Sequence, residues 1–346
     1  MGIKDIKKIL TTKREGNMPA PTKTFTPTVY VDAAYIILRY SKTFIQSKTL
    51  SNKSGVRTLC IQNCINLIMK MVNLGTKQVW VFDNPTEPCP MKENELKMRR
   101  LATKKVTIKG KEMKNARQLL MESKETGENK ELIEELTKQI DKNDSNMNAI
   151  FDFRKNVKFL VLMLRSFGIP YVFAPAKVDG EKYASYLTKG DPHAYVLTTD
   201  TDVLLFGASN FMSPIRKKSG KYEFRNLSTA LKDTNLTDIS DLIKLGLVLG
   251  CDYCPKTYRV GPKTALKKLP NIVLSDEQKK AIKVYTDFSL CEKQGKELIT
   301  RPISTETAIK VLKSLDFGEK FLNRVSETFG ELEKTQNLTE TNDERQ

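Results

Sequence analysis

Short apolar runs alternate with amphipathic stretches along most of the chain, and this alternation predicts strands followed by helices. The run at 28–32 predicts a buried strand that stops at Asp32 and leads into a helix reaching residue 40. In 56–75, apolar residues recur near helical spacing, and Gly75 is a favourable helix stop. We expect further strands at 77–84, 169–174 and 194–200, and helices at 157–168, 181–190, 238–250 and 259–269. The pattern therefore predicts an α/β fold, with a mostly parallel central sheet flanked by helices.

The alternation is interrupted between 92 and about 146, where basic residues dominate: ten Lys or Arg stand against three Glu in 92–118. We expect two helices there, separated by a polar stretch at 124–130, although a solvated charged insertion is the plainer alternative. Residues 215–225 predict a basic hairpin that turns at Ser219–Gly220. Beyond about 275 the helical pattern is thin, and 335–346 predicts a frayed tail. These changes divide the chain into 1–91, 92–150, 151–275 and 276–346.

Charge narrows the choice of partners. With 58 basic and 41 acidic side chains the formal net charge is +17, which favours a polyanion, either nucleic acid or an acidic membrane face. Neither a run of about 20 apolar residues nor a signal peptide is visible, so we expect a soluble intracellular protein without a membrane partner. Six cysteines fit free thiols in a reducing compartment. Cys251 and Cys254 have zinc-like spacing, but a second pair is missing and His193 is the single histidine, which argues against structural zinc.

Acidic residues recur where the predicted strands end. Carboxyl ends of parallel strands meet at one edge of a sheet, so these side chains should converge. Four candidates stand at or just past a strand end: Asp32, Asp83, Asp200 and Asp202. Three more complete a set of seven: Asp179 and Glu181 in a loop after the strand at 169–174, and Asp252 after the helix at 238–250. Like charges at close range oppose folding, whereas Mg²⁺ or Mn²⁺ removes the conflict, and two such ions about 4 Å apart can clamp a phosphodiester for in-line attack by water. A single aspartate at a strand end is more often a cap or turn former, so the pattern alone leads only to a metal-dependent, polyanion-binding α/β enzyme.

Five blocks carry a resemblance to a known family: "MGI", "VDAA", "VFDN", "TTDTDVLLFG" and "LGCDYC…RVGPK". They occur in this order and at matching intervals in the flap endonuclease/XPG family of structure-specific nucleases, which the chain resembles over roughly residues 1–270. The short form, the basic middle and the plain tail are most similar to the homologues of large DNA viruses. The resemblance implies a PIN-like nuclease core, a helical arch insertion at 92–150 and a helix–turns–helix DNA-binding module.

The resemblance also implies roles for individual residues. Two Mg²⁺ ions are expected, with Mn²⁺ as a substitute. Asp32, Asp83, Asp179 and Glu181 would hold one ion and Asp200, Asp202 and Asp252 the other. Lys92 and Arg99 match the basic pair at the foot of the arch, which stabilises charge on the attacked phosphate; we interpret Arg100 as an ordinary basic residue of a basic helix. Duplex contacts are expected at Gly2, Gly261, Lys263, Lys267 and Lys268, with a K⁺ ion as a further candidate in the module's loop.

The sequence departs from the family pattern in two places. The usual Glu-x-Glu is here Asp179-Gly180-Glu181; counting forward from Pro175 would put Lys177 at the first acid position, whereas counting back from Asp200 restores Asp179 and Glu181, which is the register we adopt. The family's base-stacking tyrosine has no match, since Leu38 stands there between Tyr35 and Tyr40. The tail shows no sliding-clamp-binding motif, and a monomer is expected.

The resulting prediction is a divalent-metal-dependent DNA endonuclease with 5′-exonuclease capacity, acting on flapped, branched or nicked DNA in repair, replication or recombination. A nuclear location follows from the DNA substrate, in the host nucleus for a viral protein. Two alternatives remain: a 5′→3′ exoribonuclease built on the same core, and a catalytically silent DNA-binding protein.

Overall fold

The centre of the molecule is a twisted sheet. The computed structural model describes residues 3, 5–42, 58–92, 153–215, 220–293 and 297–343 of the chain. Within these ranges the strands are β1 (Arg14–Gly16), β2 (Thr28–Asp32), β3 (Lys77–Phe82), β4 (Tyr171–Phe173), β5 (Ala194–Leu197), β6 (Asn210–Pro214) and β7 (Tyr222–Asn226). They form one sheet in the order β1-β7-β6-β5-β2-β3-β4. Strands β2 to β6 are parallel, and β7 pairs antiparallel with β6 and β1, so the predicted mostly parallel sheet is confirmed.

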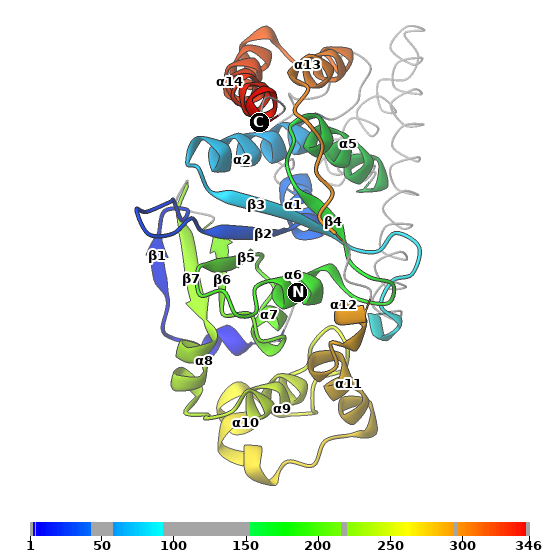
Figure 1. The fold of residues 1–346 in the computed structure, drawn as a ribbon. Coiled ribbons are helices and arrows are strands. Elements are labelled where there is room, and N and C mark those ends of the chain that lie inside the picture. The colour runs from blue at the N-terminus through cyan, green and yellow to red at the C-terminus, as the bar shows by residue number, and fades with distance from the viewer. Residues whose placement is uncertain are drawn as a thin grey trace, which may run out of the picture.

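Helices cover both faces of this sheet, as Figure 1 shows. One face carries α1 (Ala33–Lys42), α2 (Leu59–Asn73), α5 (Phe153–Ser166), α13 (Thr305–Ser314) and α14 (Glu319–Asp343). The other carries α6 (Gly180–Leu187), α7 (Asp202–Leu205), α8 (Leu227–Thr234), α9 (Ile239–Leu249), α10 (Pro262–Lys268), α11 (Asp276–Thr286) and α12 (Ser289–Lys293). Short 3₁₀ turns lie at Ile6–Lys8, Pro90–Lys92 and Leu269–Asn271. Among the helices in these ranges, none has the length and apolar character needed to cross a bilayer.

The strands are apolar on both sides because both sides are covered. In β3, Val79 and Val81 pack into the core beneath α6, α7 and α9, while Trp80 and Phe82 point into the core beneath α1, α2 and α5. This period of two is the strand geometry itself. The continuous apolar run that predicted β3 is therefore the signature of a strand buried between two helical layers.

Most predicted elements are present with boundaries shifted by a few residues. The predicted hairpin forms between β6 and β7, although its first strand begins at Asn210 rather than near 215. The short strand β1 had no prediction. Gly75 follows α2 with φ +69, the left-handed conformation that glycine adopts without strain. The arch predicted at 92–150 lies outside the described residues apart from Lys92, and the proposed division of the chain into four parts stays a prediction.

The prediction of a frayed tail at 335–346 is wrong up to Asp343, because α14 continues to that residue. The N-terminal half of α14 is anchored: Val325 and Phe329 are fully buried, and Phe329 stacks on Phe167 with ring centroids 3.9 Å apart. Extending a helix that has already formed adds one hydrogen bond for each residue fixed, so a polar sequence can follow on from a packed one.

Candidate metal centre and nucleic-acid interface

The acids predicted to converge do so at the carboxyl edge of the parallel strands. Asp32 is the last residue of β2, and Asp83 directly follows β3, the neighbouring strand. Asp200 and Asp202 follow β5 on the other side of β2. Asp179 and Glu181 lie at the start of α6, which follows β4. Parallel topology therefore brings side chains from four strand ends to one edge.

Asp32 is held rigidly by its neighbours. Its Oδ1 accepts a hydrogen bond from the backbone N–H of Tyr35 at 2.9 Å, and its Oδ2 accepts one from the Thr198 hydroxyl at 3.0 Å. The first of these bonds is the helix-start contact that the plainer interpretation of a strand-end aspartate expects. Burial raises the pKa of Asp32 to about 6 despite these two donors.

The Asp-Gly-Glu sequence has a steric reason. The backbone N–H of Gly180 donates to Asp83 Oδ1 at 2.8 Å, which ties the start of α6 to the end of β3. A Cβ at residue 180 would lie 3.0 Å from that same oxygen and 3.3 Å from the Asp83 backbone nitrogen. This close approach favours glycine between the two acids.

Asp179 stands at the N-cap position of α6, but its side chain makes no capping hydrogen bond. It accepts a short hydrogen bond from the Tyr253 hydroxyl, which also lies 3.3 Å from Glu181 Oε1. Lys177 is exposed and has a positive φ of 65°. The register that counts back from Asp200 is the one that places acids at the site.

Lys92 lies in the middle of the acidic cluster. Its Nζ is 2.5 Å from Glu181 Oε1, 3.4 Å from Asp179 Oδ2 and 3.8 Å from Asp252 Oδ2. The same ammonium lies 5.1 Å from the centroid of the Tyr253 ring. Burial alone would lower the pKa of Lys92, but the carboxylates of Asp179 and Glu181 outweigh it and raise the pKa well above its usual range. Lys92 is therefore a cation at any physiological pH.

Asp200 and Asp202 are fully buried, and each has one oxygen tied to the protein and one that is not. Asp200 Oδ1 accepts from the backbone N–H of Asp202 at 3.0 Å, and Asp202 Oδ2 accepts from the Tyr285 hydroxyl at 3.1 Å. Asp200 Oδ2 and Asp202 Oδ1 are buried with no hydrogen-bond partner. A buried carboxylate oxygen without a donor is unfavourable by about 1–3 kcal/mol or more, so these two atoms call for an explanation.

The positive charge of Lys92 does not neutralise the acidic cluster. Burial, and then the charge of Asp202, raises the pKa of Asp200 to about 7. Burial raises the pKa of Asp202 well above its usual range, and it does the same for Glu181 even beside Lys92. Several acids that would be ionised in water therefore hold their charge unfavourably here, and an added cation would stabilise them.

The donor set fits a hard divalent cation, because it consists of carboxylate oxygens and includes two buried oxygens without partners. Across the parts of the chain that the structure describes, no group of three His, Cys, Asp or Glu side chains stands ready to hold a metal ion as placed. Lys92 Nζ lies between Asp179, Glu181 and Asp252. A cation held by these three carboxylates would therefore compete with the ammonium for their oxygens.

The predicted duplex contacts lie apart from the acids, on the segment that joins α9 to α10 and on α10 itself. Lys263, Lys267 and Lys268 are exposed, and Gly261 precedes the first residue of α10. Lys263 and Lys267 are four residues apart and share one face of the seven-residue helix, and Lys268 is its last residue. A K⁺ ion in the preceding loop stays a prediction. Of the remaining predicted site residues, Gly2 and Arg99 lie outside the described residues.

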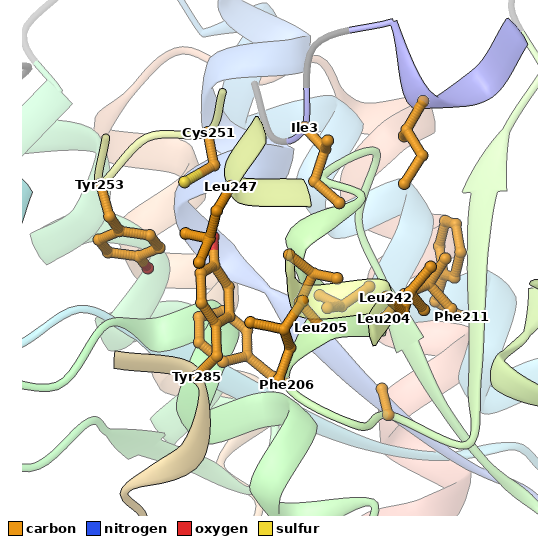
Figure 2. Packing of buried hydrophobic residues seen from close by; sticks show 14 of the residues in the cluster. Ile3, Leu204, Leu205, Phe206, Phe211, Leu242, Leu247, Cys251, Tyr253 and Tyr285 are labelled. Atoms are coloured by element: carbon orange, nitrogen blue, oxygen red, sulfur yellow. The ribbon is translucent and has the colours of Figure 1, made fainter. Parts of the chain in front are cut away.

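Residue 3 is the first described position, and it reaches the site. The backbone N–H of Ile3 donates to the Thr201 hydroxyl at 3.1 Å, between the two aspartates of the "TTDTD" segment. The Ile3 side chain packs into the core with Leu205 and Leu247, as Figure 2 shows. Ile3 therefore lies beside the acids, whereas the expected role of Gly2 stays a prediction.

The Cys251–Cys254 pair flanks Asp252 and lies in a tight turn. The two sulfur atoms are 3.6 Å apart, and the backbone N–H of Cys251 donates to the Cys254 carbonyl. Both thiols are buried and free. That this pair holds no metal of its own stays a prediction.

Sequence reasoning missed the two tyrosines that contact the acids. Tyr253 stands inside the "CDYC" block, directly after Asp252, so its position beside an expected ligand was an available signal. Tyr285 gives no local signal, since it belongs to a helix 83 residues beyond Asp202. Such a contact is set by how α11 packs on α9.

Known proteins share both the sequence pattern and the fold. The family model for the XPG I-region matches residues 168–252, which include five of the seven acids. Flap endonuclease 1 of Caenorhabditis elegans is 31% identical over 278 residues, covering 77% of this chain and 65% of that protein, just under two thirds of its length.

Solved structures agree with this fold. Flap endonuclease-1 from Methanococcus jannaschii has a TM-score of 0.59 at 22% identity, covering 93% of this chain and 97% of that one. Human GEN1 in complex with Holliday junction DNA has a TM-score of 0.57 at 16% identity, covering 95% and 77%. The fold and the gathered acids agree with the sequence comparisons. The matched I-region and the similarity to flap endonuclease 1 lead to one conclusion: the chain belongs to the flap endonuclease/XPG family.

Proposed function

We propose that the chain is a divalent-metal-dependent, structure-specific DNA endonuclease with 5′-exonuclease capacity, which hydrolyses phosphodiester bonds in flapped or nicked DNA. The observation that carries the proposal is the pair of buried, partnerless oxygens, Asp200 Oδ2 and Asp202 Oδ1, within a cluster of acids. The similarity to a flap endonuclease, and to a GEN1 structure that holds Holliday junction DNA, supports the same class of activity. Repair, replication and recombination are the processes that supply such substrates.

The acids divide into two ligand sets. Asp32, Asp83, Asp179 and Glu181 would hold one Mg²⁺, and Asp200, Asp202 and Asp252 the other, with Mn²⁺ as a substitute. When bound, the ions would neutralise the cluster and polarise the attacked phosphate and the attacking water. The protein contributes rigidity: hydrogen bonds from Tyr35 and Thr198 fix Asp32, and the Gly180 N–H fixes Asp83.

Lys92 is the residue that we assign to the phosphate. Its ammonium already lies among the carboxylates that would surround the reacting group, so a short movement takes it from acid to phosphate oxygen. A buried ammonium near developing negative charge lowers the barrier more than an exposed one, because the local dielectric is low. We assign Arg99 to the same task.

The α10 surface is assigned to the duplex. Lys263, Lys267 and Lys268 would contact phosphates without reading sequence, while Gly261 lets the backbone approach closely. The net charge of +17 is consistent with a polyanionic partner of this kind. A K⁺ ion in the preceding loop, action as a monomer and a nuclear location belong to the same proposal.

The test is incision of a 5′-labelled double-flap substrate, made in parallel from DNA and from RNA, in Mg²⁺ or in EDTA. Wild type should cut the DNA flap near its junction in Mg²⁺ only, and Asp200→Ala should bind the DNA but leave it intact. Preferential cleavage of the RNA flap would instead favour an exoribonuclease. Binding of both substrates without incision by either protein would refute the assignment as an enzyme.

A further inference from the structure

Tyr285 lies deep beneath the acidic cluster. It stands near the end of α11, which packs on α9, and its side chain is 1% exposed. The ring packs against Phe206, with centroids 4.9 Å apart, and edge-on against Tyr253 at 5.4 Å. Figure 2 shows these three rings together beside Leu247 and Cys251. The ring is therefore fixed on several sides, and its hydroxyl has a defined position.

That hydroxyl determines how Asp202 is presented. It donates to Asp202 Oδ2 at 3.1 Å, while Asp202 Oδ1 is buried without a partner. A carboxylate with one oxygen held and the other unpartnered is restricted in rotation and offers a single oxygen in one direction. Asp200 shows the same division, since the Asp202 N–H holds Oδ1 and leaves Oδ2 unpartnered.

We propose that Tyr285 is a positioning residue of the metal centre, which fixes the Asp202 carboxylate so that Oδ1 is the oxygen presented to a divalent cation. The proposal rests on the proposed function, because it takes Asp202 as a ligand. Tyr285 itself does not touch the cation or the substrate; it acts through Asp202. Partners that orient the ligands of a metal commonly change its affinity by 10–100-fold when they are removed.

The alternative is that Tyr285 only fills the core. Tyr285→Phe separates the two, because phenylalanine keeps the ring contacts with Phe206 and Tyr253 and removes the hydroxyl alone. A packing role would leave cation affinity unchanged in this variant. A positioning role would weaken it even when folding is intact.

The measurement is Mn²⁺ binding to the DNA-free protein, followed by the loss of the free-ion electron paramagnetic resonance signal. Tyr285→Phe should bind Mn²⁺ about 10-fold more weakly than wild type. The matched control is Tyr171→Phe, since Tyr171 is equally buried and its hydroxyl accepts from Arg165 Nε at 2.6 Å, on the other face of the sheet. That control should bind Mn²⁺ as wild type does, and thermal melting should show both variants folded.

A second arm tests whether the effect passes through Asp202. In an Asp202→Asn background the hydroxyl has no carboxylate to orient, so adding Tyr285→Phe should cause no further loss of Mn²⁺ affinity. Independent losses in the two backgrounds would overturn the positioning role. Equal Mn²⁺ affinity of Tyr285→Phe and wild type would overturn it as well, while leaving the nuclease proposal intact. Absence of Mn²⁺ binding by wild type would overturn the metal centre itself, and the positioning role with it.

Discussion

Replacing Asp200 with asparagine is expected to stabilise the metal-free protein and to abolish cleavage. Asp200 is fully buried, and its carboxylate shares the site with Asp202 and Glu181. Asparagine keeps the acceptor that receives the Asp202 N–H and removes the negative charge. Its amide nitrogen would stand where Oδ2 lacks a donor, facing other carboxylates. The substitution therefore relieves a conflict that only a cation relieves in the wild type.

The size of the expected gain in stability follows from the pKa of Asp200, which burial and Asp202 raise from 3.8 to about 7. Each unit of pKa is worth about 1.4 kcal/mol, so at pH 8 the ionised carboxylate lowers the free energy of unfolding by about 4 kcal/mol. The direction of the pKa shift determines how stability changes with pH. Because the folded state holds the proton more tightly than the unfolded state, the cost is absent below about pH 4, grows as pH rises, and is complete above about pH 7.

The assay is urea denaturation in EDTA at pH 8 and at pH 4.5. Asp200→Asn should be more stable than wild type by up to about 4 kcal/mol at pH 8, with most of the gain lost at pH 4.5. Asp241→Asn is the control, since Asp241 is exposed, and it should stay within about 0.5 kcal/mol of wild type. A loss of stability in Asp200→Asn at pH 8, or an equal gain at both pH values, would show that the buried charge of Asp200 does not destabilise the metal-free protein.

Three further predictions concern the neighbours of this site. Lys92→Met should lower the free energy of unfolding in EDTA at pH 8 by about 3 kcal/mol, because it leaves Glu181 and Asp179 without their ammonium. Mg²⁺ should raise the melting temperature of this variant more than that of wild type, and equal responses to Mg²⁺ would contradict the prediction. Gly250→Ala should destabilise the protein by about 1–3 kcal/mol more than Gly190→Ala, because both glycines have a positive φ but only a Cβ at residue 250 would lie 2.6 Å from the Lys256 backbone nitrogen. Chemical denaturation of the two variants measures this difference, and equal losses of stability would exclude the clash. Alanine at Lys263, Lys267 and Lys268 together should weaken DNA binding and lower the slope of log K against log salt concentration by up to about 3, whereas alanine at the exposed Lys310, Lys313 and Lys320 on the opposite face should not. Equal slopes for the two triple variants would reject α10 as the duplex surface.

The convergence of the acids could be predicted because parallel strands covered on both faces have a recognisable apolar pattern in the sequence. Asp32 and Asp83 directly follow runs of buried residues, and parallel strands with both faces covered are apolar throughout. Once the strands were placed, their ends had to meet at one edge. Asp179 needed more than the pattern, since its register depended on a loop; the structure supplies the reason in the tight approach of Gly180 to Asp83.

Other features of the structure could not be predicted from a local sequence pattern. The strand β1 consists of Arg14, Glu15 and Gly16, without an apolar side chain, and it exists because it pairs with β7, not because of its own alternation. Tyr285 meets Asp202 only after α11 has packed on α9. The ion pairs of Lys92 with Glu181, Asp179 and Asp252 depend equally on tertiary structure, although the resemblance to the family had already placed a basic residue near the site.

Anomalous diffraction from crystals soaked in Mn²⁺ would show whether the acidic cluster is a metal centre. We expect anomalous peaks among the acids, with one in contact with Asp200 Oδ2 and Asp202 Oδ1, and a weaker peak at that place in Asp202→Asn crystals. We also expect Lys92 Nζ to have moved from its place between Asp179 and Glu181. Wild-type crystals with no peak at the cluster, or with manganese bound at Cys251 and Cys254 instead, would show that the acidic cluster is not a metal centre.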